Sequence, residues 1–132
     1  MDQRRLKILL ADDNPSLLRE IQRVLDQEFE IVSTVSDGHA LLEQYDRLHP
    51  EVIVTDISMP VMDGFEAVAK LRRRGQPKVI FLTVHEEQAF VDEAKSLGAM
   101  GYVLKRSRPS VLVRAVHAAH EGRFFLSPEF SE

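Results

Sequence analysis

The sequence contains no cysteine among its 132 residues. This absence excludes disulfides and thiolate metal sites and is compatible with a reducing cytoplasm, where we expect the protein to be located. Long apolar runs are missing as well. The first apolar stretch follows the basic residues Arg4, Arg5 and Lys7 and ends at Asp12, which is too short for a signal peptide or a membrane span. We therefore expect a soluble chain that does not contact the membrane.

An excess of basic residues is also missing. The chain has 17 lysines and arginines against 21 aspartates and glutamates, a net charge of −4. This balance gives no indication of nonspecific nucleic-acid binding by this segment. The length allows one domain with a substantial core, and 44% hydrophobic with 29% charged residues is typical of a soluble globular protein.

Short apolar runs that each end at a polar residue are the most informative feature of the sequence. Four of them occupy residues 8–11, 52–55, 79–82 and 101–104, and they are followed by Asp12-Asp13, Asp56, Thr83 and Lys105. A fifth strand is expected at 30–35. Amphipathic segments of helical length separate the strands, at about 15–25, 39–49, 65–71, 86–97 and 110–121. This alternation predicts an α/β fold: a doubly wound, five-stranded parallel sheet of (βα)5, flavodoxin-like type.

The carboxyl ends of parallel strands lie along one edge of such a sheet, where ligands bind. Asp12, Asp13 and Asp56 should therefore meet Thr83 and Lys105 there. Crowded carboxylates need a compensating cation, and hard oxygen donors without cysteine or a well-placed histidine favour Mg²⁺ over Zn²⁺. Mg²⁺ commonly shares its ligands with a phosphate, Lys105 could neutralise phosphoryl charge, and the Thr83 hydroxyl could donate to a phosphoryl oxygen. An aspartate in such a site can itself be the nucleophile.

In these features the chain resembles the receiver domains of two-component response regulators, over residues 6–121. The resemblance is carried by Asp12-Asp13, the segment TDISMPVMDG at 55–64, Thr83, Tyr102 and Leu104-Lys105. It implies that Asp56 accepts a phosphoryl group from a sensor histidine kinase. It also implies that Asp12, Asp13 and Asp56 hold Mg²⁺ together with the backbone carbonyl of Ser58. Such a domain is not an enzyme beyond its own phosphorylation and dephosphorylation.

The resemblance further implies a switch through Thr83 and Tyr102. The phosphoryl charge would draw the Thr83 hydroxyl toward it and leave space into which Tyr102 turns inward, reshaping the face of the fourth helix, fifth strand and fifth helix. Ser58 and His85 would line the path of the water that hydrolyses the phosphoryl group. One position departs from the pattern, because many receivers have a cis proline directly after the lysine, where this chain has Arg106. A cis peptide before a non-proline residue costs roughly 3 kcal/mol, and the sequence leaves the isomer open.

Two enzyme or cofactor classes with related features are disfavoured by single positions. A haloacid-dehalogenase-type phosphatase needs a second aspartate two residues after the nucleophile, where this chain has Ser58. A flavodoxin needs a loop rich in Ser, Thr and Gly after the first strand, where Asp12-Asp13-Asn14-Pro15 would repel the flavin phosphate.

The end of the chain predicts the domain organisation. We expect a receiver domain at 1–122 and a C-terminal extension at 123–132, whose segment GRFFLSPE at 122–129 resembles the junction of NarL/LuxR-type regulators. The extension would begin a linker to an absent helix-turn-helix domain, so the protein would be a transcription factor that binds DNA only through that domain. Homodimerisation on phosphorylation is implied by the same resemblance. The alternative is a complete single-domain receiver that acts through protein–protein interaction, with residues 124–126 packed as a clasp on the first or fifth helix.

Overall fold

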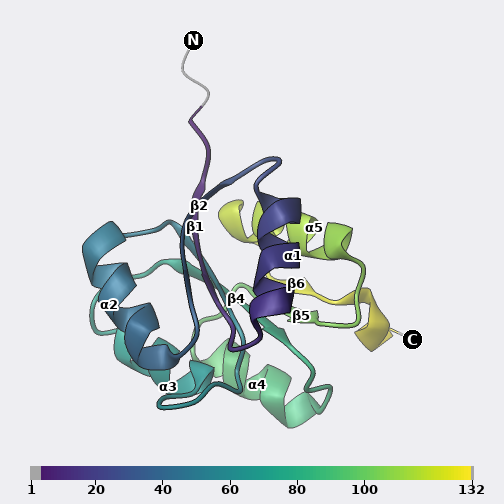
Figure 1. The fold of residues 1–132 in the computed structure, drawn as a ribbon. Coiled ribbons are helices and arrows are strands. Elements are labelled where there is room, and N and C mark those ends of the chain that lie inside the picture. The colour runs from purple at the N-terminus through teal and green to yellow at the C-terminus, as the bar shows by residue number, and fades with distance from the viewer. Residues whose placement is uncertain (1–3, 132) are drawn as a thin grey trace.

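A parallel sheet forms the centre of the computed structural model, which describes residues 4–131 (Figure 1). Within that range the strands follow the order β2-β1-β3-β4-β5-β6, and every neighbouring pair is parallel. Their bounds are β1 Lys7–Ala11, β2 Glu30–Val35, β3 Val52–Thr55, β4 Lys78–Thr83, β5 Gly101–Leu104 and β6 Phe125–Leu126. The order reverses between β1 and β3, the topological switch point at which ligands bind in open α/β sheets.

The predicted fold class is confirmed, and the predicted number of strands is wrong by one. The sixth strand, β6, consists of two residues that pair with β5 at its outer edge. A strand of two residues is too short to show the alternation that identifies strands in a sequence. Its partner strand, β5, is also distant in the sequence, because α5 lies between β5 and β6. The two strands become neighbours only when the chain folds.

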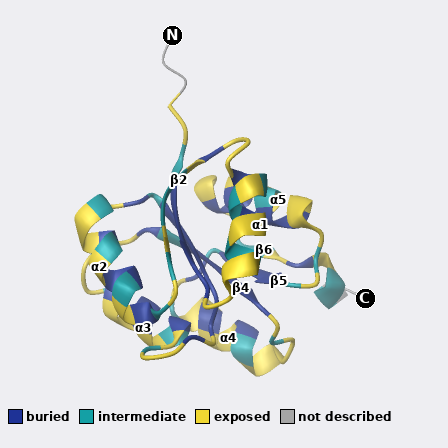
Figure 2. Cartoon of the chain, viewed as in Figure 1, coloured by how far each residue is buried: buried dark blue, intermediate teal, exposed yellow. Residues whose placement is uncertain are grey.

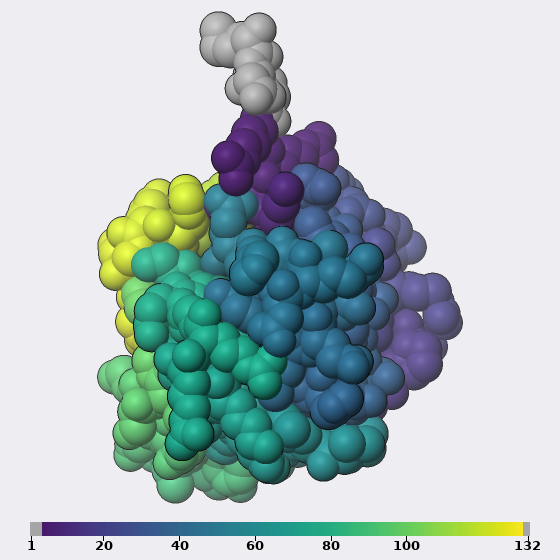
Figure 3. All heavy atoms as spheres, turned by 90° about the vertical axis from the view of Figure 1, so that its left-hand side faces the viewer, coloured from purple at the N-terminus to yellow at the C-terminus, as the bar shows by residue number. Residues whose placement is uncertain are grey.

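Five helices cover both faces of the sheet within the described residues. They are α1 Pro15–Leu25, α2 Gly38–Leu48, α3 Gly64–Leu71, α4 Gln88–Ser96 and α5 Pro109–His120. The buried side chains of α1 and α5 belong to one apolar cluster, and those of α2, α3 and α4 to the other. Figure 1 shows the same division, and in the space-filling view of Figure 3 α2 covers the middle of the face turned to the reader. None of the described helices is both long and apolar enough to span a membrane.

Alternating residues of β1 divide the core between these two clusters. Ile8 and Leu10 pack with α1 and α5, whereas Leu9 and Ala11 pack on the opposite side. Because both faces are covered, β3 and β5 are buried along their whole length and β1 and β4 at all but their first residue, as the dark strands in Figure 2 show. Burial on both faces is why these strands appear in the sequence as continuous apolar runs rather than as alternating patterns.

Most helix ends lie where local signals place them. The Asn14 side chain accepts the backbone N–H of Leu17 at 3.2 Å, with Pro15 at the first helical position of α1, and both residue types favour the start of a helix. Gly98 and Gly122 follow α4 and α5 with φ values of 81° and 82°, the left-handed conformation in which glycine commonly ends a helix. Helix α4 is an exception, because it begins at Gln88 rather than at about residue 86. It lacks a side-chain cap, and Glu86 instead pairs with Arg106.

The basic segment after α3 includes a partly buried arginine that connects two helices. Basic side chains at the end of a helix commonly lie in solvent and complement the helix dipole. The Arg72 guanidinium instead donates to three backbone carbonyls at 2.9–3.0 Å, those of Leu97, Pro77 and Gly98. These bonds join the end of α3 to the end of α4 and the approach to β4. Arg73 is exposed, as expected.

Candidate functional site

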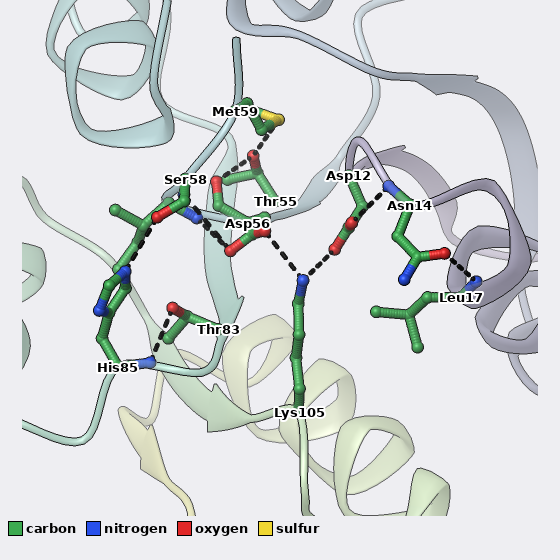
Figure 4. Close-up of polar contacts among 11 residues, drawn as sticks. Asp12, Asn14, Leu17, Thr55, Asp56, Ser58, Met59, Thr83, His85 and Lys105 are labelled. Carbon is green, nitrogen blue, oxygen red and sulfur yellow. Dashed lines mark hydrogen bonds and ion pairs between the residues drawn. The ribbon is translucent and has the colours of Figure 1, made fainter.

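Side chains that follow four different strands meet at the carboxyl edge of the sheet (Figure 4). Asp12 and Asp13 follow β1, Asp56 follows β3, and Lys105 follows β5, while Thr83 is the last residue of β4. Carboxylate oxygens of Asp12, Asp13 and Asp56 lie within 4.8 Å of one another. Asp12 and Asp56 are 2% and 4% exposed, whereas Asp13 is exposed to solvent. The structure therefore brings together all five residues that the strand ends predicted.

The Lys105 ammonium joins the two buried carboxylates. Its Nζ lies 2.8 Å from Asp12 Oδ2 and 2.8 Å from Asp56 Oδ2, and Figure 4 shows it reaching between them. Burial by itself lowers the pKa of Lys105, but the hydrogen bonds and charges of Asp12 and Asp56 outweigh it, so the pKa is raised. The side chain is thus a fixed positive charge at neutral pH.

Asp12 retains acceptor capacity that the protein does not use. Its Oδ1 accepts the Asn14 N–H at 2.9 Å. Its Oδ2 is buried and has no hydrogen bond of normal geometry, so the ion pair with Lys105 is its only described polar contact. Burial raises the pKa of Asp12, and the contact with the Lys105 ammonium and the hydrogen bond from Asn14 offset this only in part. A buried carboxylate oxygen without a hydrogen bond, next to two further carboxylates, suits a hard divalent cation such as Mg²⁺.

Asp56 is held in place by the loop that follows it. Its Oδ1 accepts the N–H of Ile57 at 2.7 Å and that of Ser58 at 3.4 Å, and its own N–H donates to the Ala11 carbonyl at 2.9 Å. The start of α3 closes the loop, because the Gly64 N–H donates to the Ile57 carbonyl at 2.7 Å. A Cβ at Gly64 would lie only 2.1 Å from the Asp56 carbonyl oxygen, so this contact requires glycine.

Thr83 and Tyr102 both contact the loop after β4. Thr83 is fully buried, and its Oγ1 accepts the His85 N–H at 3.2 Å, which leaves the hydroxyl proton free to donate elsewhere. Tyr102 is also fully buried, and its hydroxyl donates to the His85 carbonyl at 2.8 Å. Burial raises the pKa of this phenol. The Tyr102 side chain lies inside in this structure, and its movement on phosphorylation stays a prediction.

His85 contacts Ser58 at the site, where the family resemblance placed both side chains (Figure 4). Its Nε2 lies 2.9 Å from Ser58 Oγ, and its ring stacks on Phe90 at a centroid distance of 4.2 Å. Ser58 and His85 are 27 positions apart, and no local pattern connects them. Beyond Lys105 the chain continues through a trans peptide, since the described residues contain no cis bond, and Arg106 pairs with Glu86 at 2.8 Å.

Comparison with known proteins gives a consistent result. The sequence profile of the response regulator receiver domain matches residues 8–117. The chain is 30% identical over 132 residues to the transcriptional regulatory protein DegU of Brevibacillus brevis, with 98% of this chain and 56% of that protein covered. It is 32% identical over 123 residues to the nitrate/nitrite response regulator protein NarL of Escherichia coli K12, with coverages of 91% and 57%. The chain therefore spans less than three fifths of the length of these two relatives.

Solved structures agree with the sequence comparison. A LuxR-family two-component response regulator from Aurantimonas sp. SI85-9A1 matches with a TM-score of 0.91 at 30% identity, covering 96% of this chain and 93% of that one. The signal receiver domain of the putative response regulator NarL from Mycobacterium tuberculosis matches with a TM-score of 0.86 at 32% identity, with coverages of 91% and 99%.

Proposed function

The chain belongs to the receiver domains of two-component response regulators, of the NarL/LuxR type, and on this basis we propose that Asp56 is its phosphoacceptor. The donor would be the phosphohistidine of a sensor kinase. Phosphorylation of an aspartate is the general function of this family. The observation that carries the assignment is the position of Asp56, whose carboxylate lies within 4.8 Å of two other carboxylates and 2.8 Å from the Lys105 ammonium.

The proposed transfer is a single displacement. The P–N bond of the phosphohistidine breaks while a P–O bond to the Asp56 carboxylate forms, and the imidazole leaves. Lys105 already contacts Asp56 Oδ2, so its charge is in place to neutralise the phosphoryl oxygens. The Thr83 hydroxyl supplies a donor, because its proton is not used by His85. Beyond its own phosphorylation and dephosphorylation, the domain would act as a signalling element rather than as an enzyme.

The residues of the site fit Mg²⁺. Asp12, Asp13, Asp56 and the backbone carbonyl of Ser58 would hold the ion, which when bound supplies charge neutralisation for the carboxylates and the phosphoryl oxygens. The support is the buried Asp12 Oδ2 without a hydrogen bond, together with a donor set made only of oxygen.

Thr83 and Tyr102 are proposed to transmit the phosphorylated state. A phosphoryl group that engages the Thr83 hydroxyl would disturb the Oγ1 contact with His85, whose carbonyl binds the Tyr102 hydroxyl. The change would then reach the start of α4 through His85, without requiring Tyr102 to enter from outside. NMR of the beryllofluoride-bound chain should show shifts concentrated in α4, β5 and α5. Shifts confined to the phosphorylation site would contradict this role.

The output is proposed to be transcriptional, with residues 1–122 as the receiver and 123–132 as the start of a linker to a helix-turn-helix domain. The support is the similarity to DegU and NarL, which are longer than this chain. DNA would be bound only by that further domain, and phosphorylation would promote a homodimer.

The alternative is a complete single-domain receiver that acts on other proteins. It is favoured by the pairing of β6 with β5, which connects the described part of the extension to the sheet. The reading frame downstream of Glu132 decides between them.

Intact-mass spectrometry tests the phosphoacceptor. Incubation with acetyl phosphate and Mg²⁺ should add one phosphoryl group to the unchanged chain and none to Asp56→Asn. Asp92→Asn, which changes an exposed aspartate of α4, should be phosphorylated like the unchanged chain. Asp13→Ala should lose the Mg²⁺-dependent reaction, because the site then lacks one of its ligands. The same adduct on Asp56→Asn would refute the assignment.

A further inference from the structure

A chain of polar groups lies behind the turn that carries Lys105. The Leu104 N–H donates to Ser127 Oγ at 2.8 Å, Ser127 Oγ lies 3.0 Å from Ser107 Oγ, and the Ser107 hydroxyl donates to Glu129 Oε1 at 2.8 Å. Ser127 is fully buried. Two of these four residues belong to the segment after α5, which is remote from the phosphorylation site in sequence.

The direction of every bond in the chain follows from counting protons. A serine hydroxyl has one proton, and that of Ser107 is donated to Glu129. The Ser127 hydroxyl must therefore donate to Ser107, while its lone pair accepts the Leu104 N–H. The hydrogen bond from Ser107 also lowers the pKa of Glu129, so the chain ends on a carboxylate at neutral pH. Hydrogen bonds aligned in this way strengthen one another.

These bonds hold both ends of one short turn. Leu104 precedes Lys105, Ser107 follows Arg106, and both contact Ser127. Within the turn the Ser107 N–H donates to the Leu104 carbonyl at 3.0 Å. Ser127 is in turn fixed to the sheet, because its N–H donates to the Tyr102 carbonyl at 2.9 Å. The turn is thus anchored on the C-terminal segment.

We propose that Ser127 is a positioning residue of the phosphoryl site, which holds the Leu104–Ser107 turn so that the Lys105 ammonium stays between Asp12 and Asp56. The inference rests on the proposed phosphorylation of Asp56 and deepens it. Lys105 Nζ is 2.8 Å from both carboxylates, so the same ammonium favours a bound phosphoryl group and opposes a divalent cation. Loosening the turn should weaken binding of a phosphoryl analogue and should not weaken binding of Mg²⁺.

This difference between the two ligands distinguishes a positioning role from general damage to the fold. General damage would weaken the binding of both the phosphoryl analogue and Mg²⁺. The perturbation is Ser127→Ala, which leaves the Leu104 N–H without its acceptor. The matched control is Leu126→Ala, which shortens the partly exposed neighbouring side chain of β6 and leaves the polar chain intact. The probes are Mg²⁺ alone and beryllofluoride at saturating Mg²⁺, both followed by NMR titration of the whole chain.

Beryllofluoride should bind Ser127→Ala about two- to tenfold more weakly than the unchanged chain, the range expected for one lost hydrogen bond. Mg²⁺ should bind this variant equally well or more tightly. Hydrogen exchange of the Leu104 amide should become faster in the variant. Leu126→Ala should match the unchanged chain in all three measurements, and Ser127→Thr, which keeps the hydroxyl, should restore the beryllofluoride affinity.

Glu129→Ala provides a second test that does not depend on a buried position. It removes only the last acceptor of the polar chain, the Glu129 carboxylate. Beryllofluoride should therefore bind Glu129→Ala more weakly than the unchanged chain, but with a smaller loss than in Ser127→Ala. Equal beryllofluoride affinity in Ser127→Ala, Glu129→Ala and Leu126→Ala would overturn the role of Ser127, as would a parallel loss of Mg²⁺ affinity. If Ser127→Ala does not fold, an unchanged beryllofluoride affinity of Glu129→Ala is sufficient to overturn the proposal. Absence of any Asp56 adduct in the unchanged chain would instead refute the proposed function.

Discussion

Removal of the Lys105 charge should have two separate effects, one on the stability of the fold and one on the affinity of the site for Mg²⁺. Lys105→Ala takes the ammonium away from two carboxylates whose side chains are only 2% and 6% exposed. Three carboxylates would then lie within 4.8 Å of one another without a cation. The fold should lose stability in the absence of Mg²⁺, and the same change should make the site more attractive to Mg²⁺.

The magnitude of both effects follows from the geometry. Breaking a buried ion pair by removing one partner typically costs about 3–5 kcal/mol, and the 17% exposure of the Lys105 side chain to water reduces this to about 2–3 kcal/mol. Unit charges about 4 Å apart interact by about 4 kcal/mol at an effective dielectric constant of about 20. Because the long lysine side chain can move away from a bound ion, only part of that repulsion is relieved. We expect Mg²⁺ to bind about tenfold more tightly, which corresponds to about 1.4 kcal/mol.

Urea unfolding with and without Mg²⁺ measures both quantities. Circular dichroism is the suitable probe, because the chain has no tryptophan. A Mg²⁺ concentration about 100 times Kd should restore about 2.7 kcal/mol to the variant. Arg106→Ala is the matched control, since it alters the next residue and an exposed pair with Glu86 and should change stability little. If Lys105→Ala keeps both the stability and the Mg²⁺ affinity of the unchanged chain, the ammonium does not compensate the carboxylates.

Three further changes test the fold around the site. Arg72→Ala should lower the free energy of unfolding by about 2–3 kcal/mol in urea, because three backbone carbonyls lose a charged donor, whereas the exposed Arg73→Ala should have little effect. Gly64→Ala should cost about 1–3 kcal/mol and reduce phosphorylation by acetyl phosphate, since the new Cβ would collide with the Asp56 backbone; an undiminished phosphorylation rate would contradict this. Tyr102→Phe should cost about 1 kcal/mol in thermal unfolding while intact mass still shows the phosphoryl adduct, and loss of the adduct would show a role in the chemistry itself.

Some features of this protein depend on neighbouring residues and could be predicted from the sequence. Continuous apolar runs identify the buried strands β1, β3, β4 and β5, and Asn14-Pro15 identifies the start of α1. Parallel strands with crossover helices have their carboxyl ends at one edge, so the meeting of Asp12, Asp56 and Lys105 follows from topology alone. This inference needs no knowledge of the distances between residues that are far apart in the sequence.

Other features depend on contacts between distant residues and became evident only in the tertiary structure. The pairing of β6 with β5, the contact of Ser58 with His85 and the buried state of Tyr102 have no local periodicity to indicate them. The polar chain from Leu104 to Glu129 is the clearest case. A serine in a loop is compatible with many local structures, and only the folded chain places Ser127 where a buried N–H needs an acceptor. The sequence by itself therefore determined which groups form the proposed phosphorylation site, and the tertiary structure decided how those groups are held.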